Sequence, residues 1–260
     1  MPSAIDHLAV AVPDPAAAAD LLAERLGISF SSGGQHPGMG TVNRVAFLGD
    51  PYLELIGVID PGLADEWPIG RAALRTLERG GGLATYGLVE DELEAAVARL
   101  QAAGSPIDPI TRGSRQRADG ELVEWWSASP PELGPDRPPF LIKHARIGSE
   151  WGPEALEARR EMRHPIGSPA ILVRLDIATP DPPALAAEYL AQIGIEFWAV
   201  ADLAVSTVGP HTIRLVPSRE MEVPAVVVIG ADVAEPRTIE ALGLRFDVEP
   251  VKLPAVLPTG

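Results

Sequence analysis

The sequence contains no cysteine, which excludes disulfides, thiolate zinc sites and a cysteine nucleophile. Any metal would have to be held by histidine, aspartate, glutamate or water. No run of residues approaches the roughly 18 apolar residues that a membrane helix needs. The N-terminal residues also lack the basic and then apolar pattern of a signal peptide. We therefore expect no membrane association, and the cytoplasm as the place of action.

Positive charge is also scarce, since 21 Lys and Arg residues face 36 Asp and Glu residues, for a formal net charge of −15. Only Lys143 and Lys252 are lysines. Nucleic-acid backbones are bound by clustered Lys and Arg, so we expect no nucleic-acid partner. The glycine-rich stretch "GGQHPGMGTVNR" at residues 33–44 lacks the Lys-Ser/Thr ending of a phosphate-binding loop. A nucleophile elbow and a dinucleotide-binding fingerprint are missing too.

What the sequence does contain is an internal repeat. Three segments each pass from an apolar run to an aspartate, then to an Ala/Leu-rich stretch that ends at a glycine. The spacing is the same in Asp14 to Gly27, Asp91 to Gly104 and Asp181 to Gly194. A fourth, shorter copy starts at "AVVVIGADVAEPRTIEALGLRF". The chain is therefore expected to consist of repeated structural units.

Each copy has the local signals of a strand, a helix and further strands. Residues 5–12 alternate in the manner of a strand, Asp14 suits a helix N-cap, and Pro15 suits the first helical position. Gly27 suits the left-handed residue that ends the helix. The stretches "TVNRVAFL" and "YLELIGV" then read as strands separated by the turn "GDP". The predicted unit is βαβββ.

We predict an α+β fold in which tandem βαβββ units form curved mixed sheets around a cleft, arranged as two paired-unit modules. The first module covers residues 1–148 and contains the expected active site. Residues 149–169 are charged and mostly helical, and are expected to be a linker. The second, more degenerate module covers residues 170–260.

The tandem units, which open with "DHLAVAVPD" and reach "YLELIGV", resemble the vicinal oxygen chelate superfamily of glyoxalase I, bleomycin-resistance proteins and extradiol dioxygenases. The stretch "GGQHPGMGTVNRVAFLGDPYLELIGV" is similar to the glyoxalase-like branch, which shares a loop of the form Gly-Gly-x-His-Pro-x-x-Gly-Thr-x-Asn. The resemblance covers residues 4 to 145 well. Residues 170–250 resemble the superfamily only in the repeat pattern.

The resemblance implies one divalent metal (Fe, Mn, Zn or Ni) at the floor of the cleft, with His7 and Glu54 as metal ligands or as catalytic acid/base residues. An equivalent pair is expected from the second unit, but the matching positions are Ala84 and Ile142. A shift in register offers Tyr86 or His144 instead, which we disfavour because register decides the face of a strand side chain. In the third unit the matching positions are Arg174 and Arg214, which cannot hold a cation.

A ligand-binding cleft is expected around this pair of residues. Its walls are predicted to include Tyr52, which alternates onto the same face as Glu54, and Tyr86, Trp126 and Phe140. Glu124 is predicted to be the polar contribution of the second unit. The predicted rim contains His36 and Asn43, since the glycines around them permit close approach to a ligand. For the aromatic residues, packing in the core is the competing interpretation.

Two functions remain open at this point. The first is a glyoxalase-like lyase, isomerase or dioxygenase that acts on a small oxygenated molecule, with the metal polarising a carbonyl or stabilising an enolate. The alternative is a metal-free protein that binds and sequesters a small molecule, as bleomycin-resistance proteins do, and Ala84 and Ile142 favour it. The resemblance also makes a homodimer plausible.

Overall fold

The first half of the chain folds into two successive βαβββ units, as the repeat predicts. The computed structural model describes residues 1–117 and 119–251. The elements of the first unit are β1 (Ala4–Ala11), α1 (Pro15–Leu26), β2 (Gly34–His36), β3 (Thr41–Phe47) and β4 (Tyr52–Val58). Those of the second unit are β5 (Gly82–Val89), α4 (Leu93–Ala102), β6 (Thr111–Arg117), β7 (Leu122–Ala128) and β8 (Phe140–His144).

Helix α1 begins and ends at the residues that the sequence signals indicate. The Asp14 side chain accepts hydrogen bonds from the first free backbone N–H groups of the helix, and Pro15 follows at the first position. Gly27 ends the helix in the left-handed conformation, with φ of 76°. Leu22 and Leu26 lie on the buried face. The helix therefore combines strong local signals with one apolar stripe.

The eight strands of the two units close into a barrel with the strand order β1-β4-β3-β2-β6-β7-β8-β5. Strand β1 pairs in parallel with β4 and antiparallel with β5, and β2 joins the two units by pairing with β6. Two further helices, α2 (Pro61–Asp65) and α3 (Pro68–Leu77), lie between the units and were not predicted. Small buried residues of α3, Ala72 and Ala73, pack in a cluster with Phe140 and Ile142.

The segment after the barrel carries two short helices, α5 (Gly148–Trp151) and α6 (Pro153–Arg160). The second half then contains one complete βαβββ unit. Its elements are β9 (Ala170–Thr179), α7 (Pro182–Ile193), β10 (Trp198–Val200), β11 (Leu203–Val208) and β12 (His211–Pro217).

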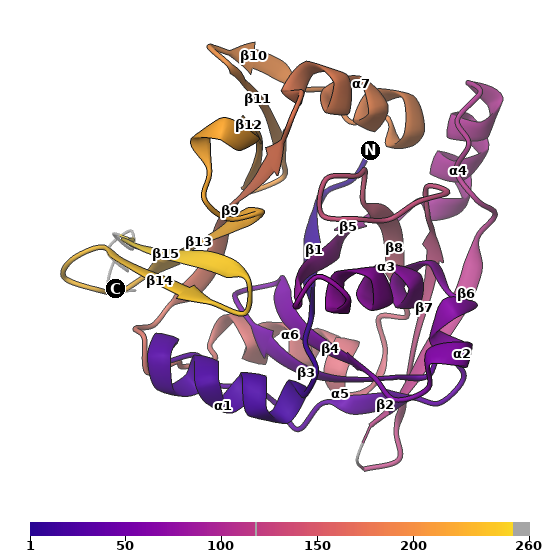
Figure 1. Cartoon of the computed structure of the whole chain (residues 1–260). Helices are drawn as coiled ribbons and strands as arrows, with labels where there is room; N and C mark the ends of the chain where they lie inside the picture. The colour runs from indigo at the N-terminus through magenta and orange to yellow at the C-terminus, as the bar shows by residue number, and fades with distance from the viewer. Residues whose placement is uncertain (118, 252–260) are drawn as a thin grey trace, which may run out of the picture.

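The fourth copy has no helix. The one-turn 3-10 helix Ser218–Glu220 is followed by β13 (Ala225–Ala231), β14 (Arg237–Ala241) and β15 (Leu244–Pro250). The second half therefore forms an open seven-stranded sheet in the order β10-β11-β12-β9-β13-β15-β14, and its two edges do not meet (Figure 1). In the other copies a helix follows the first strand. In the fourth copy residues 233–236 lead directly into β14 instead, so this copy contains only strands.

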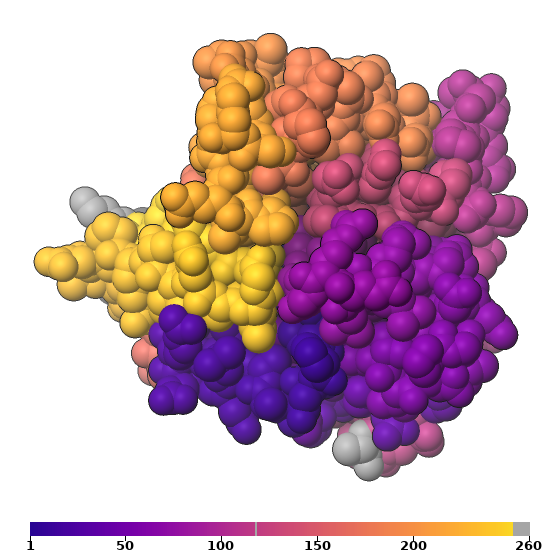
Figure 2. Space-filling model, in the orientation of Figure 1, coloured from indigo at the N-terminus to yellow at the C-terminus, as the bar shows by residue number. Residues whose placement is uncertain are grey.

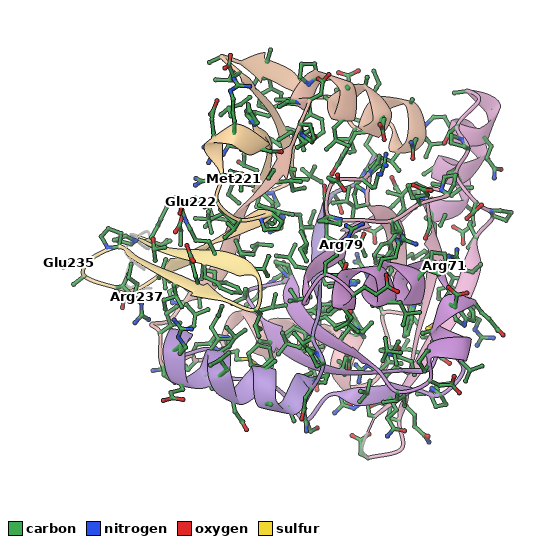
Figure 3. All side chains as sticks on the ribbon, viewed as in Figure 1. Arg71, Arg79, Met221, Glu222, Glu235 and Arg237 are labelled. Carbon is green, nitrogen blue, oxygen red and sulfur yellow. The ribbon has the colours of Figure 1, made fainter. Side chains whose placement is uncertain are left out.

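One apolar core runs through both halves of the chain. It joins Leu8 of β1 and Leu22 of α1 to Leu175 of β9 and Phe246 of β15. On the face shown in Figure 2 the second half packs closely against the first. In Figure 3, Arg71 marks the first turn of α3 and Arg79 the chain just after its end, while Arg237 marks the start of the edge strand β14. The boundaries of the two modules, 1–148 and 170–260, stay a prediction.

No helix within residues 1–117 and 119–251 is long and apolar enough to cross a membrane.

Candidate functional site

The inside of the barrel holds a cavity of about 70 Å³, several times the space that one enclosed water needs. Both units contribute to it, together with the start of α3 and the short helix α5. Its polar lining residues include His7, His36, Asn43, Glu54, Arg115, His144 and Glu150. Its large apolar lining residues include Tyr52, Trp67, Trp125 and Trp151. A small, partly polar ligand would fit such a space.

Glu54 is held in place by the glycine-rich loop. Its Oε1 atom accepts a hydrogen bond of 2.7 Å from Asn43 Nδ2, and Asn43 Oδ1 accepts one of 2.9 Å from the Gly34 backbone N–H. Gly33 has a φ of 68°, and a Cβ atom there would lie only 1.8 Å from the Asn43 carbonyl oxygen. The two glycines therefore allow the loop to approach β3 closely enough to orient Asn43, and through it Glu54.

His7 lies on the inner face of β1, beside Glu54. Its Nε2 atom is 3.6 Å from Glu54 Oε2, and its Nδ1–H donates a hydrogen bond of 2.6 Å to Asp6 Oδ1. Burial alone would lower the pKa of His7, but the hydrogen bond to Asp6 and the negative charges of Asp6 and Glu54 outweigh it and raise the pKa. The imidazolium form, with an N–H directed towards Glu54, is therefore favoured.

Asp6 joins His7 to a second histidine of the cavity wall. The same Oδ1 atom of Asp6 accepts a hydrogen bond of 3.1 Å from His144 Nε2, and the His144 ring stacks on Trp151 with centroids 3.5 Å apart. Burial would raise the pKa of the Asp6 carboxyl, but the two histidines lower it well below its usual range. Asp6 is therefore a buried carboxylate that orients both rings.

His36 forms part of the inner wall rather than the rim. It is buried, its Nδ1 atom lies 2.8 Å from Thr41 Oγ1, and its ring meets Trp125 edge-on. Burial lowers its pKa to about 4, with the positive charges of Arg115 and His7 adding to the effect and Glu54 opposing it. His36 therefore offers a neutral imidazole to a ligand at neutral pH.

The donor atoms around His7 and Glu54 do not fit the metal site that the resemblance implies. Residues 1–117 and 119–251 contain no group of three His, Asp or Glu side chains placed to hold a metal ion. One nitrogen of His7 is taken by Asp6, and one oxygen of Glu54 by Asn43. Ala84 and Ile142, the matching positions of the second unit, are buried apolar residues. A structural zinc site takes four protein ligands and a catalytic one three, so a two-atom set falls short.

Tyr52 lies in the cavity wall where the alternation of β4 predicts it, stacked on the His7 ring with centroids 4.7 Å apart. Phe140 is on the inner side of the barrel and contacts the His7 ring edge-on, but it lies outside the cavity lining. Burial, helped by the charges of Asp6 and Glu54, raises the pKa of Tyr52 well above its ordinary value. Tyr52 therefore stays a neutral phenol.

Besides Phe140, three further predicted ligand-binding residues, Tyr86, Glu124 and Trp126, lie outside the cavity. Tyr86 faces the second half of the chain, where its hydroxyl lies 2.8 Å from that of Tyr189. Irregularities in the β1–β5 pairing change which residues of β5 face inwards, and Tyr86 pairs with Leu8. Trp126 packs against the outer core, and Glu124 pairs with Arg112 on the outer face of the barrel. Trp125, the neighbour of both, is the tryptophan that lines the cavity.

Several cavity residues were missed by the sequence analysis. His144 lies two positions after Ile142, so both share the inner face of β8 and both line the cavity. Of the two residues that the disfavoured shift offered, His144 reaches the cavity and Tyr86 does not. Asp6, which supports the cavity residues His7 and His144 without lining the cavity, was also missed although it precedes His7 in the chain. The alternation of "TRGSRQR" in β6 contained a usable signal, since Thr111, Gly113 and Arg115 share the inner face. Nothing in the local sequence points to Trp67 or Glu150.

Comparisons with known proteins agree with this architecture. The chain matches the glyoxalase-like domain family over residues 5–193, so it belongs to that family, as the resemblance to the vicinal oxygen chelate superfamily predicts. No curated protein matches the chain in sequence. A hypothetical protein from Staphylococcus aureus has the same fold, with a TM-score of 0.75 and 16% identity over 95% of this chain and 99% of that one.

Two enzymes of known structure are more distant. Methylmalonyl-CoA epimerase from Mycobacterium tuberculosis aligns with a TM-score of 0.42 and 17% identity over 55% of this chain and 89% of its own. A mutant of 4-hydroxymandelate synthase from Streptomyces coelicolor aligns with a TM-score of 0.49 and 15% identity over 90% of this chain and 72% of its own. The family is shown by the family match and the fold by the likeness to the Staphylococcus aureus protein.

Proposed function

We propose that the protein is an isomerase or lyase that moves a proton on a carbon atom next to a carbonyl group of a small molecule. The observation that carries this proposal is the pairing of His7 Nε2 with Glu54 Oε2 at 3.6 Å, inside a cavity and with each residue held from behind. Asp6 orients His7 and Asn43 orients Glu54. Such a supported acid and base pair is the arrangement that general acid–base catalysis requires.

In the proposed step, Glu54 Oε2 takes a proton from the carbon, and the electron pair of the C–H bond moves into the carbonyl group to give an enolate. The His7 Nε2–H group donates a hydrogen bond to the enolate oxygen and stabilises its charge. Where the carbon that lost the proton carries a hydroxyl group, return of the proton from Glu54 to the former carbonyl carbon, with transfer of the hydroxyl proton to the enolate oxygen, completes an isomerisation. Where the next carbon carries a leaving group, the electron pair of the enolate forms a C=C bond, and the leaving group departs with the electron pair of its own bond to complete an elimination instead.

We propose that this chemistry runs without a metal held by the protein. The support is the donor set, since His7 Nε2 and Glu54 Oε2 are free but the described residues place no third histidine or carboxylate with them to hold a metal ion. The dioxygenase option needs a redox metal, and the same two-atom set argues against one that is held by side chains. In this proposal His7 and Glu54 act in proton transfer and not in metal ligation.

A second candidate is a binding protein without catalysis, which the apolar part of the cavity favours. Trp67, Trp125 and Trp151 all line it, and Ile142 lies where a polar group was expected. The same cavity would then hold a small molecule by contact with aromatic rings.

One experiment separates the two candidates. The protein is incubated in deuterated water with a panel of small carbonyl compounds, and the loss of protons next to the carbonyl is followed by NMR. We expect exchange with the wild-type protein, and a loss of at least about 100-fold in Glu54→Gln, which removes the base. Glu124→Gln, a glutamate on the outer face of β7, is the matched control and should exchange normally. Binding of a compound without any exchange would support the binding protein instead.

A further inference from the structure

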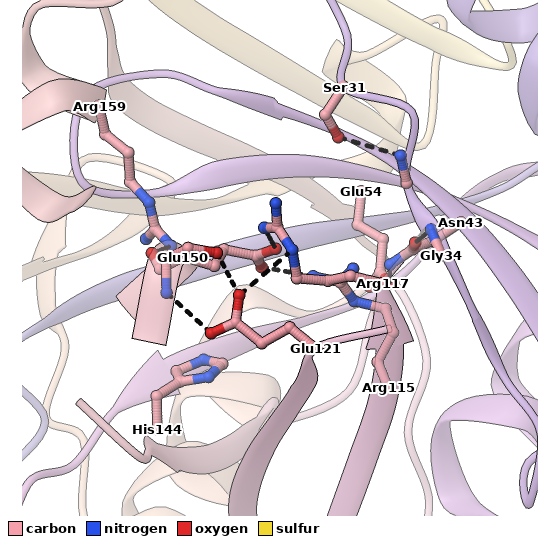
Figure 4. Close-up of polar contacts among 12 residues, drawn as sticks. Ser31, Gly34, Asn43, Glu54, Arg115, Arg117, Glu121, His144, Glu150 and Arg159 are labelled. Carbon is pink, nitrogen blue, oxygen red and sulfur yellow. Dashed lines mark hydrogen bonds and ion pairs between the residues drawn. The ribbon is translucent and has the colours of Figure 1, made fainter. Parts of the chain in front are cut away.

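Three arginine side chains converge on one glutamate at the wall of the cavity. Glu150, from the short helix α5, pairs through its two oxygens with Arg115 and, at 2.7 Å, with Arg117 Nη1. Arg159 donates a hydrogen bond to the backbone carbonyl of Glu150 (Figure 4). Arg117 also pairs with Asp119 and lies 3.6 Å from Glu121, whereas Glu150 is the one ion-pair partner of Arg115 among the described residues.

Arg115 is the member of this cluster that reaches the cavity. It lies on the inner face of β6 and is only 5% exposed, and no other arginine or lysine of the described residues lines the cavity. The charges of Arg115 and Glu54 both affect the pKa of His36, as expected for three side chains that lie close together inside the barrel. A buried arginine needs an anionic partner, because an unpaired charge in a protein interior is expensive.

The partner that Arg115 has in this structure comes from the connection between the two halves. Glu150 sits in a helix of four residues, Gly148–Trp151. The Arg115–Glu150 pair also separates two spaces, because both residues line the inner cavity and an outer groove of about 440 Å³. The outer groove is lined by Arg117 and Arg159 as well. An anion that enters through this groove therefore passes three arginines, Arg115, Arg117 and Arg159, and two carboxylates, Asp119 and Glu150.

The other two arginines can keep Glu150 in place when it leaves Arg115. Arg117 has its own bond to Glu150, and Arg159 is fixed by stacking on the rings of Phe47 and Trp151. The Nη1 atom of Arg159 is buried and has no hydrogen-bond partner among the described residues. The cluster therefore has unused donor capacity, and a second carboxylate would satisfy it better than Glu150 does alone.

We propose that the ligand of the cavity carries a carboxylate, which binds Arg115 in the place that Glu150 occupies in this structure. Arginine suits this role because its planar fork of N–H groups matches the two oxygens of a carboxylate. The inference rests on the proposed function for the other end of the ligand, where a carbonyl group faces His7 and Glu54. In a cavity of about 70 Å³ the two ends can be only a few atoms apart. The substrate class is therefore a short-chain oxo acid.

Calorimetric titration tests this with pyruvate as the carboxylate probe and hydroxyacetone as its uncharged counterpart of similar size. Glu150→Gln frees Arg115 and should raise the affinity for pyruvate about 10- to 100-fold, the range of a hydrogen-bonded ion pair. Arg115→Gln should abolish pyruvate binding, and Arg115→Lys should restore part of it. The same changes should shift hydroxyacetone affinity by much less than pyruvate affinity, because hydroxyacetone has no carboxylate. Arg112→Gln and Glu124→Gln, the exposed pair on the same two strands, are the matched controls.

Two results would overturn the proposal. One is pyruvate affinity that is unchanged in Glu150→Gln or retained in Arg115→Gln, with the fold of each variant verified by circular dichroism. The other is an equal gain for pyruvate and hydroxyacetone, which would show a larger cavity rather than an anion site. Glu54→Gln should still bind pyruvate, because it keeps Arg115. If neither the wild type nor any variant exchanges protons, the proposed function is contradicted, but binding of pyruvate through Arg115 would still support the carboxylate site.

Discussion

Asp6→Asn is the substitution that tests the buried network most sharply. Asp6 accepts hydrogen bonds from His7 Nδ1 at 2.6 Å and from His144 Nε2 at 3.1 Å. A hydrogen bond to a charged group contributes about 1.5–3 kcal/mol. The asparagine carbonyl still accepts a bond but lacks the charge, so we expect the free energy of unfolding to fall by about one such bond, or about 1.5–3 kcal/mol near pH 6.

The loss should depend on pH in a defined direction. The folded pKa of Asp6 is lowered, so its contribution is present above the ordinary value of 3.8 and lost as the pH falls. The folded pKa of His7 is raised, so its contribution is complete below the ordinary value of 6.5 and lost as the pH rises through the raised value. The difference between wild type and variant should therefore be largest between these two values and shrink towards pH 9.

Urea unfolding followed by circular dichroism at pH 6 and pH 9 measures this difference. Asp176→Asn is the matched control, because Asp176 is also buried but accepts hydrogen bonds from two arginines, Arg174 and Arg214. Arginines keep their charge over this range, so the loss in the control should be equal at both pH values. An Asp6→Asn loss that is also equal at both pH values would refute the assigned protonation of His7.

The remaining predictions concern the walls of the barrel. Trp125→Ala should weaken ligand binding about 10-fold or more, whereas Trp126→Ala should mainly lower stability, as calorimetry and urea unfolding of both variants will show. Tyr86→Phe removes the bond to Tyr189 and should cost about 0.5–1.5 kcal/mol of stability without changing proton exchange. In an NMR titration the His36 ring should stay neutral down to pH 5, because burial lowers its pKa to about 4; protonation near pH 6.5 would contradict its place in the wall.

The fold was largely predictable because its signals are local. Asp14, Pro15 and Gly27 define both ends of α1, and the same spacing recurs in α7 between Asp181 and Gly194. Closure of the barrel could not be predicted in this way, since it depends on pairing between β2 and β6, which are far apart in the chain. The fourth copy has no helix although its sequence resembles the other copies, so the repeat spacing alone does not predict every element.

The site was predictable only in part, and for physical reasons. Strand alternation correctly brings His7, Tyr52 and Glu54 to one interior. It fails at Tyr86, because bulges in the β1–β5 pairing change the inward face without a clear sequence signal. For Trp125 and Trp126 alternation shows only that they face opposite sides. Arg115 and Glu150 meet through tertiary packing, which no local pattern encodes.

The central claim is that Glu54 and His7 transfer a proton without a metal held by the protein. It is tested most directly by the rate of deuterium incorporation next to the carbonyl of pyruvate, measured by NMR with protein from which metals have been removed by a chelator. We predict that the metal-depleted wild type exchanges the pyruvate methyl protons at an unchanged rate, and that Glu54→Gln does not. Exchange that disappears with the metal and returns when a divalent cation is added would contradict the account.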